Sequence, residues 1–202
     1  MPTRRRLAPG RRRDELLDVG ETVFSERPFE EISMVDIAAA AGVTRALLYH
    51  YFPTKAEFFG AIWARAHERL RASGRDRPDG TVRDYVDRSL RDYLTFYAAH
   101  LPLVVIANRS SIARDPAVRR PVERVFARTC ATVLDAGGAH GRERRVAEVA
   151  FEGWIAFVRE SSLATYLGRR ISVQANLDLC LAAFDATVGR YVDLGRSMPA
   201  AD

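Results

Sequence analysis

The amino-acid sequence predicts an all-α protein. Apolar residues recur at intervals of three and four along most of the chain, and no strand-like alternation interrupts them. Proline and glycine stand where helices would end, and a polar joint at residues 73–80 separates short helices from long ones. We therefore expect an N-terminal three-helix domain with a helix-turn-helix, followed by a larger helical domain.

The first helix is expected near residues 11–26, where leucine, valine and phenylalanine have helical spacing. Pro28 ends it, because proline lacks the N–H that a helix interior needs. Ser33 and Asp36 have the spacing of a capping box and predict a second helix, which Gly42 ends after about eight residues. Thr44 is suited to cap a third short helix with the sequence "RALLYHYF".

A longer helix is expected to begin at Lys55 and to run to about Ala72, directly after Pro53. Beyond the polar joint, long helices are expected near residues 81–99, 102–114, 116–136, 142–168 and 172–196. Pro102 and Pro116 then fall in first turns, where a missing N–H is harmless. The predicted domains are a basic arm at 1–10, a helix-turn-helix domain at 11–54 and a helical domain at 55–202.

Composition narrows the class of protein. The 202 residues are 48% hydrophobic, which is enough for a sizeable core. No apolar run approaches the roughly 20 residues of a membrane span, and no secretory signal follows the first arginines, so we expect a cytoplasmic protein without a membrane partner. Cys130 and Cys180 lack paired or metal-type spacing, and we expect both to be buried free thiols.

Positive charge is concentrated at the start of the chain, although the net charge is only +5. Six arginines, at positions 4–6 and 11–13, precede the first acid, Asp14. A basic arm suits a polyanionic partner, and a solubilising tail is the alternative.

The stretch "AAGV" between the two short helices has the features of a helix-turn-helix turn. Its glycine can adopt a backbone geometry closed to most residues, and the second helix of such a motif enters the major groove of DNA. Arg45 and Ala46 lie in the first turn, which reaches base edges. Hydrogen-bond donors suited to phosphates follow at Tyr49, His50, Tyr51 and Lys55, which is the chain's only lysine.

Two neighbouring residues have a different expected role. Leu48 and Phe52 have the spacing of residues that face the first helix, so we expect them in the core. Tyr49, His50 and Tyr51 are consecutive and span about 300° of the helical wheel, so they cannot all be buried on one stripe.

The segment "FEEISMVDIAAAAGVTRALLYHYFPTKAEFF" resembles the DNA-binding signature of the tetracycline-repressor (TetR) family of bacterial regulators. The resemblance covers about 45 residues through the pattern "IA…AGV…LY…F…K". It implies a three-helix DNA-binding domain and a larger all-helical domain that binds a ligand and dimerises. The residues that it implies contact phosphates are Ser33, Thr44, Tyr49, Tyr51 and Lys55, with base or groove contacts near Arg45, Ala46 and His50. Tyr51 stands where the family usually has histidine.

Aromatic residues, several of them with polar tips, form a stripe on the helix expected near 81–99. Four of them are Tyr93, Phe96, Tyr97 and His100, and side chains from other helices could converge with them: Trp63, His67, Asn108 and Trp154. An aromatic cavity with a few polar groups is what a small-molecule site needs. The same residues could instead fill a core.

The last two helices are apolar on two sides. One side carries Phe151, Trp154 and Val158, and another carries Gly153 and Phe157. A second copy of the chain could cover one of these faces and give a homodimer. Burial of both faces within one chain is the alternative.

The sequence therefore favours a one-component transcriptional regulator, most simply a repressor that a small-molecule effector releases from a double-stranded DNA operator. An architectural or protein-partnered DNA-binding protein without a small-molecule ligand is the competing hypothesis. We expect no enzyme, cofactor or metal site, because no nucleophile elbow, phosphate loop, dinucleotide fingerprint or metal-ligand spacing occurs.

Overall fold

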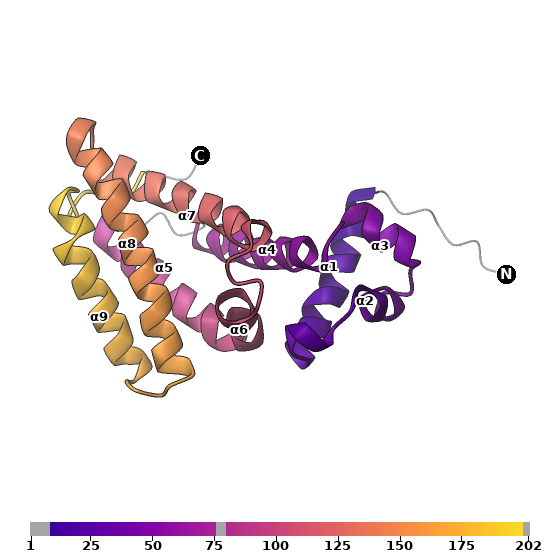
Figure 1. Cartoon of the computed structure of the whole chain (residues 1–202). Helices are drawn as coiled ribbons and strands as arrows, with labels where there is room; N and C mark the ends of the chain where they lie inside the picture. The colour runs from indigo at the N-terminus through magenta and orange to yellow at the C-terminus, as the bar shows by residue number, and fades with distance from the viewer. Residues whose placement is uncertain (1–8, 76–79, 200–202) are drawn as a thin grey trace. The chain divides into compact units, whose positions relative to one another are not determined.

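The computed structural model describes residues 9–75 and 80–199, and within these ranges it is all-α, as predicted (Figure 1). Nine α-helices and two 3-10 helices are assigned there. The elements are α1 (Pro9–Glu26), η1 (Phe29–Glu31), α2 (Met34–Ala40), α3 (Arg45–Tyr51), α4 (Lys55–Arg75), α5 (Val82–Ala99), α6 (Leu101–Arg109), α7 (Pro116–Ala136), α8 (Gly141–Tyr166), α9 (Val173–Ala186) and η2 (Val188–Arg190). No helix in the described ranges is long and apolar enough to cross a membrane.

The N-terminal arginines divide into two groups. Arg11–Arg13 belong to α1, which begins at Pro9 rather than after the arm. Arg4–Arg6 lie outside the described residues, and so does most of the arm predicted at 1–10.

The chain forms two compact units whose limits differ from the predicted domains. Unit 1 comprises the residues up to Ala66 together with Pro102–Val122, and unit 2 comprises His67–Leu101 and the residues from Glu123 onward. The expected boundary at residue 54 therefore does not coincide with a unit boundary. The first part of α4, most of α6 and the start of α7 pack with the helix-turn-helix instead.

Five phenylalanines form the centre of unit 1. Phe24 lies 5.8 Å from Phe29, 6.0 Å from Phe58 and 5.4 Å from Phe59 between ring centroids, and Phe52 lies 4.8 Å from Phe58. All five rings are buried. These contacts hold α1 and the helix-turn-helix against α4.

The helices α4 and α7 approach each other closely at Gly60. A Cβ atom added at Gly60 would lie 2.1 Å from the carbonyl oxygen of Ala117. That oxygen would normally accept the helical hydrogen bond of residue 121, but Pro121 has no N–H. Glycine on one helix and proline on the other therefore bring the start of α7 into unit 1.

Unit 2 contains a buried polar cluster between α8 and α9. Trp154 Nε1 donates to the carbonyl oxygen of Cys180 at 2.8 Å, and Asn176 Nδ2 donates to Ser162 Oγ at 3.4 Å. Cys130 and Cys180 are both buried and free, as expected. Burial raises the pKa of each thiol, for Cys130 to about 11, which suits structural rather than reactive cysteines.

Two helices end earlier than predicted. The sixth was expected to reach residue 114 but ends at Arg109, and the last was expected to reach 196 but ends at Ala186. The chain after α9 instead turns back to the start of α5. There the carbonyl oxygens of Arg196 and Leu194 accept hydrogen bonds from the amides of Val82 and Arg83 at 2.8 and 3.0 Å. This return satisfies helix-end donors that would otherwise lack partners.

Candidate nucleic-acid interface and ligand cavity

The helices α2 and α3 are defined by local hydrogen bonds that the sequence predicted. Ser33 and Asp36 form a complete capping box at the start of α2, and Thr44 Oγ1 accepts from the amide of Leu47 at the start of α3. Gly42, in the turn, has φ of +61°, a left-handed conformation that side chains other than glycine rarely adopt. The segment is therefore a helix-turn-helix.

One face of α3 is exposed and carries residues predicted to read DNA. Arg45, Ala46, Tyr49 and His50 are exposed, whereas Leu48 is buried, as predicted, against unit 1. The exposed set offers a guanidinium, a phenol hydroxyl and an imidazole on a single helix face. Such groups can contact base edges and phosphates.

The remaining predicted DNA contacts differ in how available they are. Thr44 is exposed, and Tyr51 is half-buried with its ring 5.5 Å from that of His50. Ser33 is exposed, but its hydroxyl donates to Asp36 Oδ2 at 2.7 Å and accepts from the Asp36 amide at 3.1 Å. A phosphate contact by Ser33 would have to compete with its capping role.

Lys55 makes contacts inside unit 1 that the sequence did not reveal. Its ammonium donates to the carbonyl oxygens of Phe29 and Ile32, each at 2.7 Å, and lies 3.9 Å from the centroid of the Phe29 ring. Two of its three N–H groups are therefore engaged within the protein. The predicted phosphate contact would be left with the third.

Unit 2 contains a cavity of about 90 Å³ between α4, α5, α7 and α8. Its lining is largely aromatic and aliphatic, with few polar side chains. The lining residues are His67, Leu70, Arg71, Tyr85, Val86, Ser89, Leu90, Asp92, Tyr93, Val125, Phe126, Thr129, Val133, Phe151, Trp154, Ile155 and Val158. A mostly apolar cleft or cavity with a few polar groups is the usual form of a small-molecule site.

The cavity includes some of the predicted ligand residues and not others. His67, Tyr93 and Trp154 line it. Phe96, Tyr97 and His100 belong to the same unit but not to the lining, and Phe96 packs against the His67 ring at 5.3 Å. Trp63 and Asn108 belong to unit 1, and Asn108 Nδ2 donates to the carbonyl oxygen of Val104 at 2.8 Å.

Sequence reasoning missed the part of the lining that comes from α7. Val125, Phe126, Thr129 and Val133 recur at intervals of one, three and four residues. This spacing indicates that the four residues share one face of a helix. A helix face packed in a core has the same spacing, so the pattern alone does not identify a cavity lining.

The polar groups of the cavity are mostly neutral. Burial, reinforced by the charge of His100, lowers the pKa of His67 to about 3, so its imidazole is uncharged at neutral pH. Burial also raises the pKa of the Tyr93 hydroxyl well above its usual value. Two opposite charges complete the lining, Arg71 and Asp92, and Arg71 forms an ion pair with Glu68 at 3.2 Å.

A third surface lies on α8 and α9. Val146, Val149 and Phe157 of α8 are exposed, and so is Leu179 of α9. A Cβ atom added at Gly153, on the same side of α8, would meet nothing within 4 Å.

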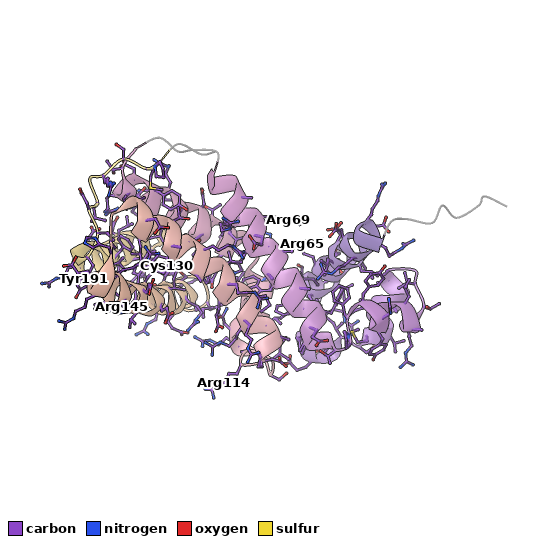
Figure 2. The ribbon with its side chains drawn as sticks, turned by 90° about the horizontal axis from the view of Figure 1, so that it is seen from above. Arg65, Arg69, Arg114, Cys130, Arg145 and Tyr191 are labelled. Atoms are coloured by element: carbon purple, nitrogen blue, oxygen red, sulfur yellow. The ribbon has the colours of Figure 1, made fainter. Side chains whose placement is uncertain are left out.

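Next to this face is an open groove lined by arginine, tyrosine and small apolar side chains. Its residues are Arg142, Arg145, Val146, Val149, Ala150, Ala186, Thr187, Arg190 and Tyr191. Arg145 and Tyr191 are seen at the same end of unit 2 in Figure 2. The apolar face and the basic groove are thus continuous through Val146 and Val149.

In the ranges that the structure covers, no three histidine, cysteine or acidic side chains are grouped so that they could hold a metal ion. The described residues offer two candidate binding surfaces, one on α3 in unit 1 and one in the cavity of unit 2.

Comparison with known proteins agrees with a DNA-binding helix-turn-helix in unit 1. Residues 16–62 match the family model described as bacterial regulatory proteins of the tetR family. The HTH-type transcriptional repressor KstR of Rhodococcus jostii is 23% identical over 173 residues, which is 82% of each chain. KstR2 of the same organism is 48% identical over 44 residues, or 22% of each chain. A tetR-family regulator from Streptomyces coelicolor has a similar structure, with a TM-score of 0.69 and 26% identity, over 89% of this chain and 80% of that one.

The exposed helix-turn-helix and these likenesses together define a DNA-binding transcriptional regulator with an all-helical second unit. Residues 16–62 carry the DNA-binding region of the tetR family of bacterial regulatory proteins, and the chain as a whole is similar to regulators of that family.

Proposed function

We propose that the protein is a one-component repressor that a small molecule releases from DNA. Unit 1 binds the operator through α3, and a ligand in the unit 2 cavity lowers the affinity for the operator. The observation that carries this proposal is the presence, in one chain, of an exposed α3 face that includes Arg45 and His50 and a partly open, aromatic-lined cavity. The relatives named as repressors support the direction of control.

We further propose that two copies bind the operator together through the exposed face of α8 and α9. Val149 is 69% exposed, which is unusual for a valine within a long helix of a folded unit. Gly153 lets a second helix approach closely, because no atom of its own chain occupies the space beside it. A two-fold dimer would present two reading helices to half-sites about 34–36 Å apart.

Selection of bound sequences from random duplexes tests the DNA-binding part of the proposal. The expected product is an inverted repeat with half-sites about one helical turn apart. The selected duplex is then used to measure the dissociation constant with and without candidate ligands. A ligand that occupies the cavity and weakens DNA binding supports regulation by an effector.

The competing hypothesis is an architectural DNA-binding protein without a small-molecule ligand. It predicts selected sequences with little base preference and a DNA affinity that no cavity ligand changes. A ligand proven to occupy the cavity without any effect on DNA affinity would therefore decide against the repressor proposal.

A further inference from the structure

The cavity of unit 2 limits the ligand in both size and charge, and this inference rests on the function proposed above. A cavity of about 150 Å³ lined by apolar side chains is known to take up benzene. The present cavity, at about 90 Å³, is smaller. A ligand that enters without rearranging the unit can therefore have no more than one ring, and part of a substituted ring would extend into the open side of the cavity.

The walls of the cavity favour an aromatic or similarly flat ring. Tyr85, Tyr93, Phe126, Phe151 and Trp154 all contribute to the lining. Aromatic side chains bind rings through stacked and edge-to-face contacts in addition to simple apolar burial. Five such side chains in the lining therefore favour an aromatic ring over an aliphatic ligand.

The buried polar groups favour an uncharged ligand. His67 is 2% exposed and lies in a cage of rings, with centroids 5.3 Å from Phe96, 5.3 Å from Phe126 and 6.1 Å from Tyr93. Its neutral imidazole can exchange a hydrogen bond with a ligand but cannot balance a carboxylate. Trp154 Nε1 is already committed to the carbonyl oxygen of Cys180.

The two charged residues of the lining do not change this conclusion. Arg71 and Arg128 share one carboxylate, Glu68, and Asp92 of the lining supplies a second negative charge, so these four charges sum to zero. Asp92 is half-buried and carries the opposite sign to Arg71. A charged ligand would lose its hydration without gaining a dedicated partner of opposite charge, which is costly in an apolar site.

We propose that the ligand of this cavity is an uncharged, single-ring aromatic molecule with one hydrogen-bonding substituent that meets His67. The class is that of simple phenols and related small neutral aromatics. Larger or ionised molecules fall outside it.

Three probes of similar size test the charge requirement: p-cresol, benzoate and benzylammonium. Calorimetry on the full chain at pH 7, without DNA, is expected to give p-cresol at least a tenfold lower dissociation constant than either ion. Benzoate that binds as well as p-cresol would overturn the proposal and assign an anion site to Arg71. Benzylammonium that binds as well would overturn it in favour of a cation site at Asp92.

Matched variants test whether the probe occupies this cavity. Thr129 lines the cavity, whereas Thr132, one turn further along α7, does not, and both hydroxyls donate to the carbonyl four residues earlier. Thr129→Phe should weaken p-cresol binding at least tenfold, and Thr132→Phe should leave it unchanged. Equal binding by both variants would place p-cresol elsewhere and overturn the proposal.

His67→Phe tests the polar contact, because it keeps an aromatic ring in the cage. Affinity for p-cresol should fall about tenfold in this variant while affinity for toluene stays within about twofold. An equal loss of affinity for p-cresol and toluene would show that His67 only shapes the cavity. It would contradict the proposed hydrogen bond between His67 and the ligand. Release of DNA is measured separately: p-cresol that binds in the cavity but leaves DNA affinity unchanged would refute the effector function while the ligand class stands.

Discussion

Lys55 Nζ donates a 2.7 Å hydrogen bond to the carbonyl oxygen of Ile32, 23 positions earlier in the chain. A second bond of the same length reaches the carbonyl oxygen of Phe29. Ile32 directly precedes Ser33, the residue that caps α2. The first residue of α4 therefore fixes the point at which the helix-turn-helix begins.

Replacing Lys55 by methionine should destabilise unit 1. Lys55→Met keeps the length of the side chain but leaves two carbonyl oxygens without their charged donor, at an expected cost of about 1–3 kcal/mol in the free energy of unfolding. Urea unfolding followed by circular dichroism measures this cost. Affinity for specific and random duplexes should fall by the same factor, because the whole helix-turn-helix is less well anchored to α4. Unchanged stability with a reduced salt slope would instead indicate that Lys55 acts mainly on a phosphate.

Arg45 should contribute to sequence selectivity rather than to stability. It is exposed in the first turn of α3, where an arginine can donate two hydrogen bonds to a guanine. Arg45→Ala should cost about 1–3 kcal/mol at the selected duplex and relax the preference at one position of each half-site. Arg45→Lys is the control, since it keeps the charge but not the paired donors. If Arg45→Ala weakens random and selected duplexes equally, the arginine contacts the backbone and not a base.

The helix-turn-helix was predictable because its signals are local. The caps at Ser33 and Thr44 and the turn at Gly42 each depend on residues no more than a few positions away. The bonds of Lys55 connect segments 23 and 26 positions apart, and no local pattern encodes such a pairing. The end of α9 depends likewise on a return of the chain to the start of α5.

The cavity was predictable in kind but not in its full lining. The aromatic stripe that contains Tyr93 indicated apolar contacts for one face of a helix, but periodicity describes a filled core and a lined cavity in the same way. Whether Phe96 or Phe126 faces the open space depends on how neighbouring helices pack. That packing depends on side-chain volumes from four helices together.

Alanine at Gly60 should destabilise the protein despite its higher helix propensity. The added methyl group would collide with the backbone carbonyl of Ala117, which cannot move aside as a flexible side chain could. We expect Gly60→Ala to cost about 1–3 kcal/mol in thermal or urea unfolding, as overpacking usually does. Gly10→Ala in α1 is the matched control, because nothing lies within 4 Å of its added Cβ. A Gly60→Ala protein as stable as the control would show that α4 and α7 separate easily here.

Mild acid should destabilise the protein through His67. Its folded-state pKa of about 3 lies below its ordinary value of 6.5, so the unfolded chain binds the proton first as the pH falls. Stability should therefore decline from about pH 6.5 downward, with a slope that approaches about 1.4 kcal/mol per pH unit. Urea unfolding at several pH values between 5 and 7 measures the slope. His67→Phe retains the other three histidines, so any decrease in the pH dependence of stability in this variant is due to His67. A variant whose stability depends on pH as the parent's does would contradict this assignment.

Charge placed on the exposed face of α8 should separate the proposed dimer. Gly153→Arg puts a guanidinium where a second helix would approach, and a charge buried there without a partner costs several kcal/mol. The variant should sediment as a monomer. Its affinity for the paired half-sites should fall to that of one copy for a single half-site, because the second copy no longer binds as part of the same dimer.

Thr95→Arg is the control for this last experiment. Thr95 is an exposed residue of α5 whose hydroxyl donates only to the carbonyl oxygen of Arg91 in its own helix, so the variant adds the same charge away from the proposed face. It should remain a dimer with the parent's affinity for the paired half-sites. Both variants should unfold at similar urea concentrations once protein concentration is taken into account, since neither substitution touches the core of unit 2. A Gly153→Arg protein that stays dimeric at micromolar concentration would show that the two copies meet through a different surface.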